Sequence, residues 1–213
     1  GLYKYLGERI DIPAPDVNTN GQIMSWFMDE YIKLNGEKMD LGTFTGKPVE
    51  FAGSLGRNAA TGFGVSIVVR EAAKRFGLDI KTAKIAVQGF GNVGNFTVKS
   101  INRQGGKVCA LAEWDRKEGN YALYNENGLD YDKMWAYKQE HGTLIGFPDA
   151  KQISEEEFWT GSYDILIPAA LENVITGDLA KKLNVKLVCE AANGPTTPEG
   201  DKVLAEKNIA LTP

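Results

Sequence analysis

The sequence has few of the residues that build metal centres and covalent cross-links. It contains two cysteines, Cys109 and Cys189, and a single histidine, His141. The usual zinc sites need clusters of cysteine and histidine, so this set predicts no metal site. Each cysteine lies inside an apolar run. We therefore expect two buried free thiols and a reducing compartment, the cytoplasm.

Long apolar runs and an excess of positive charge are also missing. No apolar run approaches the roughly 20 residues that a membrane helix needs. The net charge is −4 and the isoelectric point is near 5.2, which argues against nucleic acid or an anionic membrane as a partner. With 213 residues, of which 43% are hydrophobic and 24% charged, the chain has the composition of a soluble globular protein with a sizeable core.

The strongest functional signal lies in residues 84–115. A strand-like run over 84–88 leads into Gly89-Phe90-Gly91-Asn92-Val93-Gly94, and a helical run follows. A second apolar run, 108–112, ends before Glu113. This order of strand, glycine turn, helix, strand and acid is typical of a dinucleotide site, with the pyrophosphate at the helix N-terminus and the acid on the adenosine ribose. The alternative is an ordinary β-α-β unit whose glycine turn binds nothing.

Strand-like and helical runs alternate along most of the chain. Strands are predicted at 84–88, 108–112, 121–124, 164–168, 186–190 and 209–212, and the first long helix at 19–34. This alternation predicts an α/β fold with a doubly wound, mainly parallel, Rossmann-type sheet and an N-terminal helical segment. Ligands of such sheets bind outside the carboxyl ends of the strands. Four loops are expected there, at 89–94, 113–115 (with Trp114), 168–170 and 191–195.

Two further features left alternatives open. Pro13 and Pro15 stiffen the loop that carries Asp16, so this carboxylate is either held in a fixed place or is an ordinary surface turn residue. Gly62 and Gly64 lie early in the helix predicted over 58–76. They would admit either a neighbouring backbone or a ligand.

Four stretches, in the same order and at similar spacing, resemble the glutamate dehydrogenase family. They are Asp-Ile-Pro-Ala-Pro-Asp-Val-Asn-Thr at 11–19, Thr-Gly-Lys-Pro at 45–48 with Gly-Ser-Leu-Gly-Arg-Asn-Ala-Ala-Thr-Gly at 53–62, the glycine turn at 89–94, and Glu-Ala-Ala-Asn-Gly-Pro-Thr-Thr-Pro-Glu at 190–199. The resemblance covers nearly the whole chain and fits the glutamate branch better than the leucine and phenylalanine branch.

The resemblance implies NAD(P)-linked oxidative deamination of L-glutamate to 2-oxoglutarate and ammonia. Asp16 matches the family's catalytic aspartate, which relays protons. Thr61 and Asn92 match positions that contact the dinucleotide, and Asn193 matches one near the nicotinamide ribose. Ala169 and Ala170 would line the adenosine side through their backbone. The family also implies a homo-oligomer, a hexamer in the complete enzyme.

The resemblance further implies two parts, the tail of a substrate domain over 1–44 and a dinucleotide-binding Rossmann domain over 45–213. Nothing before Asp11 could supply the family's substrate-binding lysines, so we expect an excerpt that is inactive alone. NAD is expected over NADP, because Glu113 would repel a 2′-phosphate. The rival hypotheses are a non-catalytic nucleotide-binding or sensor module and a structural Rossmann domain without a ligand.

Overall fold

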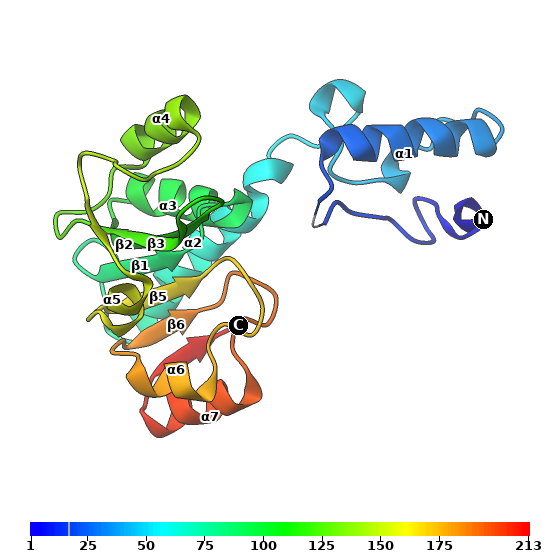
Figure 1. The fold of residues 1–213 in the computed structure, drawn as a ribbon. Coiled ribbons are helices and arrows are strands. Elements are labelled where there is room, and N and C mark those ends of the chain that lie inside the picture. Colours follow the sequence, from blue (N-terminus) through cyan, green and yellow to red (C-terminus); the bar gives the residue numbers. More distant parts are fainter. Residues whose placement is uncertain (17) are drawn as a thin grey trace. The chain divides into compact units, whose positions relative to one another are not determined.

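A computed structural model of the chain describes residues 1–16 and 18–213, so Val17 of the proline-rich stretch lies outside the described residues. The chain divides into two compact units, Gly1–Asn58 and Ala59–Pro213 (Figure 1). Each unit has hydrophobic clusters of its own. Within the described ranges, no helix combines the length and the apolar character that a bilayer span requires.

The first unit is built around α1 (Gly21–Leu34), with the short 3₁₀ helices η1 (Leu2–Tyr5), η2 (Leu41–Thr43) and η3 (Val49–Phe51) beside it in sequence. Asn20 caps α1 by accepting a hydrogen bond from the amide of Ile23. Its core consists of Met24, Met28, Tyr31 and Phe44. Met24, Met28 and Tyr31 of the predicted helix are therefore core residues, whereas Trp26 and Phe27 are exposed.

The second unit contains a seven-stranded sheet, counted over the described residues, in the order β4-β3-β2-β1-β5-β6-β7. The strands are β1 (Lys84–Gln88), β2 (Lys107–Asp115), β3 (Gly119–Tyr124), β4 (Lys151–Ile153), β5 (Ile165–Pro168), β6 (Leu187–Cys189) and β7 (Ala210–Thr212). Strands β2, β1, β5, β6 and β7 pair in parallel, and β3 and β4 add an antiparallel edge. The doubly wound, mainly parallel sheet is confirmed.

Helices cover both faces of this sheet (Figure 1). On one face lie α2 (Arg57–Arg75), α3 (Asn92–Arg103) and α4 (Tyr131–His141), and on the other α5 (Glu155–Thr160), α6 (Gly177–Lys182) and α7 (Pro198–Glu206). Successive side chains of β1 point to opposite faces of the sheet. Ile85 and Val87 belong to the hydrophobic cluster under α2, α3 and α4, and Ala86 belongs to the cluster under α5, α6 and α7.

Side-chain caps fix where the helices of the second face begin. Ser154 and Glu157 form a capping box at α5, Thr176 caps α6, and Thr197 caps α7 ahead of Pro198 at its first position. The sequence itself contains both the capping box and the proline at the first position of α7.

At the antiparallel edge the structure differs from the sequence prediction in two ways. Glu113 was expected to end its strand, but β2 continues through Trp114 and Asp115 because it pairs with β3 as a hairpin, with Glu113 opposite Tyr121. The short strand β4 was not predicted, since three residues with two exposed side chains give no periodic signal.

Both cysteines are buried free thiols, as expected, and burial raises the pKa of Cys109 to about 11.

Candidate dinucleotide site

From β1 the sheet extends through β2 on one side and through β5 on the other, so β1 lies at the switch point of the strand order. The glycine turn directly follows β1. Gly89 has φ of 96°, a conformation that side chains rarely adopt, and donates its amide to the carbonyl of Ala112 at 2.7 Å. A Cβ at Gly89 would lie 3.0 Å from the carbonyl oxygen of Ala169. The turn therefore fits closely between the ends of β2 and β5, where ligands of such sheets bind.

The second and third glycines of the turn have opposite surroundings. A Cβ on Gly94 would lie 1.9 Å from the carbonyl oxygen of Gly89, so this glycine allows α3 to pack against the turn. A Cβ on Gly91 would meet nothing within 4 Å. The space beside Gly91 is therefore open, as the approach of a pyrophosphate to the backbone would require.

The N-terminus of α3 points backbone donors at this open space. The first intrahelical bond of α3 runs from the amide of Asn95 to the carbonyl of Gly91, at 3.0 Å. The amides of Asn92, Val93 and Gly94 precede it and so have no acceptor within the helix. Asn95 also donates its side chain to the carbonyls of Gly91 and Asn92, at 2.6 and 3.1 Å, which fixes this first turn. The donors and the open space together fit a pyrophosphate.

The loops that follow β5 and β6 lie beside the glycine turn. The amide of Ala169 donates to Gln88 at 2.8 Å, and the amides of Ala191 and Ala192 donate to Pro168 at 3.0 and 3.1 Å. Asn193 follows on this second loop and is exposed. The expected loops after β1, β5 and β6 are thus brought together at one edge of the sheet.

A pocket of about 280 Å³ lies on the β2 side of the turn. Its lining residues are Gln88, Gly89, Ala112, Glu113, Trp114, Asn120, Tyr121, Glu155, Ala170 and Leu171. Of the residues predicted from the sequence, the pocket brings together Gly89, Glu113, Trp114 and Ala170. Gln88 was not predicted, and its Oε1 atom is buried without a hydrogen-bond partner among the described residues.

Other predicted residues lie elsewhere around the turn. Phe90 contributes its backbone, but its ring is 2% exposed and packs in the core against Tyr131 of α4, with ring centroids 6.2 Å apart. Asn92 is exposed at the start of α3, and Thr61 is exposed in the first turns of α2. Thr61, Asn92, Asn193 and Ala169 do not line the pocket, so their contacts with a dinucleotide stay predictions.

Glu113 is engaged from three sides. Its Oε2 atom accepts the amide of Phe90 at 3.1 Å and the ammonium of Lys138 at 2.9 Å, and its Oε1 atom accepts the amide of Trp114 at 3.0 Å. Its side chain is 16% exposed. The acid is therefore tied to the glycine turn itself. Lys138 was not predicted, because it lies 25 residues after Glu113 in the sequence and belongs to no recognisable motif.

The structure also decides between the two interpretations of Gly62. A Cβ there would lie 2.6 to 2.7 Å from Phe96, Thr97 and Val93, so this glycine admits the backbone of α3. A Cβ on Gly64 would meet nothing within 4 Å.

Asp16 lies in the first unit, on a loop that is braced by its neighbours. The carbonyl of Pro13 accepts the amide of Thr45 at 3.1 Å, and Thr19 bonds the backbone of Asp16 on both sides, at 2.5 and 2.6 Å. A Cβ on Gly46 would lie 2.5 Å from the ring of Pro15. These contacts hold the described part of the loop, and a role for its exposed carboxylate stays a prediction.

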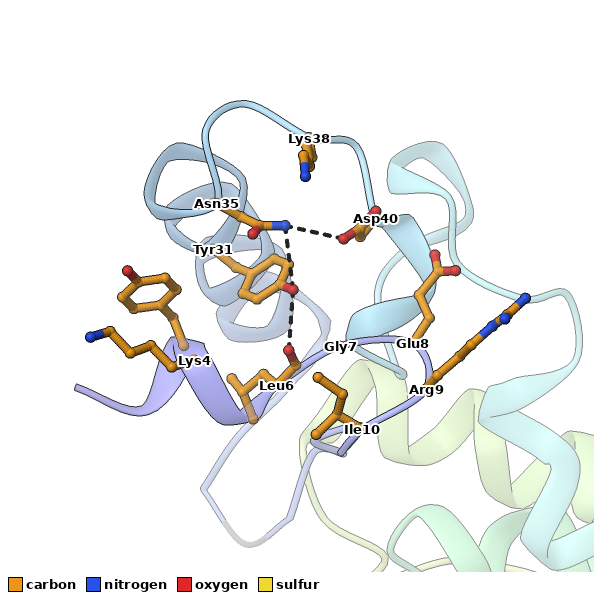
Figure 2. Close-up of a pocket in the computed structure, with 11 residues that line it drawn as sticks. Lys4, Leu6, Gly7, Glu8, Arg9, Ile10, Tyr31, Asn35, Lys38 and Asp40 are labelled. Carbon is orange, nitrogen blue, oxygen red and sulfur yellow. Dashed lines mark hydrogen bonds between the residues drawn. The ribbon is translucent and has the colours of Figure 1, made fainter.

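The same unit contains a pocket of about 410 Å³ that sequence reasoning did not find. Tyr31 donates to the carbonyl of Leu6 at 3.2 Å, and Asn35 donates to Asp40 at 3.1 Å. Figure 2 draws both hydrogen bonds among the residues that line the pocket. Its charged lining residues, Lys4, Glu8, Arg9, Lys38 and Asp40, are of both signs. Such a mixed lining selects no charge class of ligand.

The sheet order, the glycine turn and its acid together define a Rossmann-type α/β unit. Residues 52–213 match the family described as Glutamate/Leucine/Phenylalanine/Valine dehydrogenase, and residues 1–33 match its dimerisation domain. The match covers most of the chain, and the chain belongs to this family, in its glutamate branch.

Three relatives show how close the match is. The chain is 76% identical over its whole length to the NAD-specific glutamate dehydrogenase of Peptoniphilus asaccharolyticus, of which it covers 51%, and 63% identical to that of Clostridioides difficile, of which it covers 50%. The crystal structure of the hetero-hexameric glutamate dehydrogenase of Thermus thermophilus, in its leucine-bound form, matches the whole chain at 32% identity with a TM-score of 0.88, over 49% of that structure. The chain spans about half the length of the curated relatives it matches.

Proposed function

We propose that the chain is the dinucleotide-binding part of a glutamate dehydrogenase. The reaction is the oxidative deamination of L-glutamate to 2-oxoglutarate and ammonia. The observation that carries the proposal is the glycine turn, whose open side at Gly91 meets the free amides of α3 beside Glu113. Family membership and the names of the relatives support a dehydrogenase over a sensor module or a ligand-free Rossmann domain.

In this proposal the pyrophosphate is held by the amides at the start of α3, and the adenosine by the pocket around Glu113 and Ala170. Thr61, Asn92, Asn193 and Ala169 supply the remaining dinucleotide contacts that the resemblance implies. When NAD is bound, its nicotinamide ring supplies the acceptor for the hydride of the substrate α-carbon. The residues of this chain bind and orient it, and orientation contributes several kcal/mol to catalysis, roughly 7 to 11 at most.

Asp16 is proposed to move protons during deamination. A carboxylate can take a proton from the attacking water and return it to the leaving ammonia, if it is held in one place. The braced loop of Pro13, Pro15 and Thr19 supports that role, because it limits the positions that Asp16 can adopt. We propose residues 1–44 as part of the substrate domain and 45–213 as the nucleotide domain.

We propose a homo-oligomeric, cytoplasmic enzyme. The match of residues 1–33 to a dimerisation domain and the hexameric relative support an oligomer. The first unit also exposes large apolar side chains, among them Leu2, Ile10 and Trp26 at 77, 72 and 61%, and such surfaces are usually covered in an assembly. A hexamer is the specific expectation, and light scattering after size-exclusion chromatography would test it.

NAD is proposed as the cofactor in preference to NADP. The Glu113 carboxylate can accept a ribose hydroxyl, and a hydrogen bond to a charged group contributes roughly 1.5 to 3 kcal/mol. It would repel a 2′-phosphate.

Parallel fluorescence titrations with NADH and NADPH test both the site and the choice. We expect NADH to bind more tightly, and Glu113→Ser to narrow the difference. Failure of both dinucleotides to bind would contradict the proposed site. Preference for NADPH would contradict the role of Glu113 alone.

A further inference from the structure

The ion pair between Lys138 and Glu113 differs from the other ion pairs of the described residues. Its side chains are 26 and 16% exposed. In each of the others, at least one partner is more than half exposed. Solvent and salt screen exposed pairs strongly and buried pairs much less. The charge of Lys138 therefore acts on Glu113 with little loss.

Lys138 is held in place by α4. Its ammonium lies 5.3 Å from the centroid of the Phe90 ring and 3.4 Å from the carbonyl oxygen of Phe90. The same ring packs against Trp135 and Tyr131, which lie one and two turns earlier on α4 and stack on each other at 11°. An aromatic cluster thus anchors α4 to the glycine turn, and Lys138 extends from that anchor to the acid.

Lys138 occupies one of the hydrogen-bond acceptor sites of the Glu113 carboxylate. An ionised carboxylate has about four lone-pair sites, two on each oxygen. Oε2 accepts both the amide of Phe90 and the ammonium of Lys138, and Oε1 accepts the amide of Trp114. One site on Oε1 remains for a ribose hydroxyl. Lys138 and the amide of Phe90 therefore both bind Oε2, and Oε1 is left as the oxygen with an unfilled site.

The charge of Lys138 also offsets that of Glu113. A 2′-phosphate brings roughly 1.5 to 2 negative charges, whereas the 2′-hydroxyl of NAD is neutral. Beside the pair, the phosphate meets a carboxylate and an ammonium of nearly equal and opposite charge. Beside Glu113 alone, it would meet an uncompensated carboxylate in a partly buried place, where repulsion is strong.

We propose that Lys138 is a second determinant of dinucleotide choice, a positioning residue that locks Glu113 against the glycine turn and weakens its discrimination against a 2′-phosphate. The inference rests on the proposed dinucleotide site. It assigns to α4 a part in cofactor selection, and predicts that the protein with Lys138 prefers NAD less strictly than Glu113 alone would dictate.

The test is the ratio of the dissociation constants of NADPH and NADH, measured by fluorescence titration of the full chain at one salt concentration. Lys138→Met keeps the length of the side chain and removes its charge. We expect it to raise the ratio about tenfold, mainly by weakening NADPH.

Three further variants complete the design. Lys138→Arg keeps the charge and should leave the ratio within about threefold of wild type. Lys138→Gln replaces the methionine variant if that fails to fold. Lys133→Met is the matched control, because Lys133 is also on α4 and pairs with Asp149 at 2.6 Å, but with side chains 63 and 47% exposed. It should leave the ratio unchanged.

The outcomes separate the two levels of the proposal. A wild type that binds neither dinucleotide contradicts the proposed site before any variant is made. A wild type that binds, together with a folded Lys138→Met variant whose ratio is unaltered or lowered, overturns the role of Lys138 alone. An equal shift in Lys133→Met would overturn it as well, since any lost positive charge on α4 would then have the same effect.

Discussion

Gly91 and Gly94 share a residue type and have opposite surroundings. Gly91→Ala adds a methyl group to open space at a φ of −72°, which any residue can adopt. We expect this variant to melt like wild type and to bind NADH at least about tenfold more weakly, a loss of roughly 1.4 kcal/mol, because the methyl group occupies the place proposed for the pyrophosphate. Calorimetry of unfolding and an NADH titration would measure both.

Gly94→Ala is the control for that experiment. Its methyl group would lie 1.9 Å from the Gly89 carbonyl oxygen, so α3 must move. We expect a lower melting temperature, from a loss of roughly 1 to 3 kcal/mol typical of overpacking. If Gly91→Ala instead destabilised the fold as much as Gly94→Ala, or bound NADH normally, the open space at Gly91 would have no part in binding.

Asp16 is the residue proposed to relay protons. In the complete enzyme, Asp16→Asn should fold and bind NADH as before, because its loop is braced by backbone contacts of Pro13 and Thr19 that the change leaves intact. Turnover should fall by about 10² to 10⁴, since an amide cannot relay protons. Steady-state kinetics with glutamate and NAD would measure it. Unchanged turnover would make Asp16 a turn residue only.

Single residues also show what a sequence can predict. Glu113 was predictable because the strand, the glycine turn and the acid follow one another at a fixed spacing. Lys138 was not, because it reaches Glu113 only after α4 has packed on Phe90. The same holds for Gln88. Its buried Oε1 has no hydrogen-bond partner in the part of the chain that the structure describes, and its neighbours in sequence do not indicate this.

At the scale of elements, Asp164 ties three strands together at their N-terminal ends. It precedes β5 and accepts the amide of Lys84 of β1 at 2.9 Å and the ammonium of Lys186 beside β6 at 2.7 Å. Burial alone would raise the pKa of Asp164, but the bonds from Lys186 and Lys84 outweigh it and leave the pKa below its ordinary value of 3.8. The folded state therefore favours the ionised form.

This shift sets a pH dependence of known sign. A lowered pKa contributes stability above the ordinary value of 3.8, and the contribution is lost as the pH falls through the folded value. Asp164→Asn should lower the free energy of unfolding by about 1 kcal/mol at pH 7, with a smaller difference at about pH 3. Urea unfolding at both pH values would measure it.

Asp149→Asn is the matched control, because its pair with Lys133 is exposed and should contribute little. A difference between wild type and Asp164→Asn that persisted undiminished in acid would assign the effect to packing.

Some helices and strands are predicted by short sequence patterns, and others depend on a partner strand that is distant in the sequence. The capped helices α5 and α7 and the core strands β1, β5 and β6 follow from short-range patterns, and the structure has them. The edge strand β4 depends on β3 as its partner. The extension of β2 past Glu113 likewise depends on the hairpin, and local sequence does not report such pairings.

For the whole molecule, the alternation of strands and helices predicted the class of fold, because short right-handed connections leave few arrangements for such a sequence. It did not predict the division at residue 58. That division follows from two separate cores, Met24, Met28, Tyr31 and Phe44 in one unit and the two clusters on the faces of the sheet in the other. No periodic pattern in the sequence marks where one core ends.

The separate cores give a prediction for the response to a ligand. The proposed site is built from residues of the second unit, so NADH should stabilise that unit directly. At a concentration about 100 times its dissociation constant, a ligand that binds only the folded state adds about 2.7 kcal/mol. Hydrogen exchange followed by mass spectrometry would show this as slower exchange in peptides from β1, α3 and β5.

Peptides from α1 should exchange at the same rate with and without NADH, because their core of Met24, Met28 and Phe44 shares no residue with the site. This expectation can fail in an informative way. Equal protection of α1 and β1 would mean that the two units unfold together as one cooperative system. Protection of α1 alone would mean that NADH binds the first unit, and the glycine turn would then not be its site.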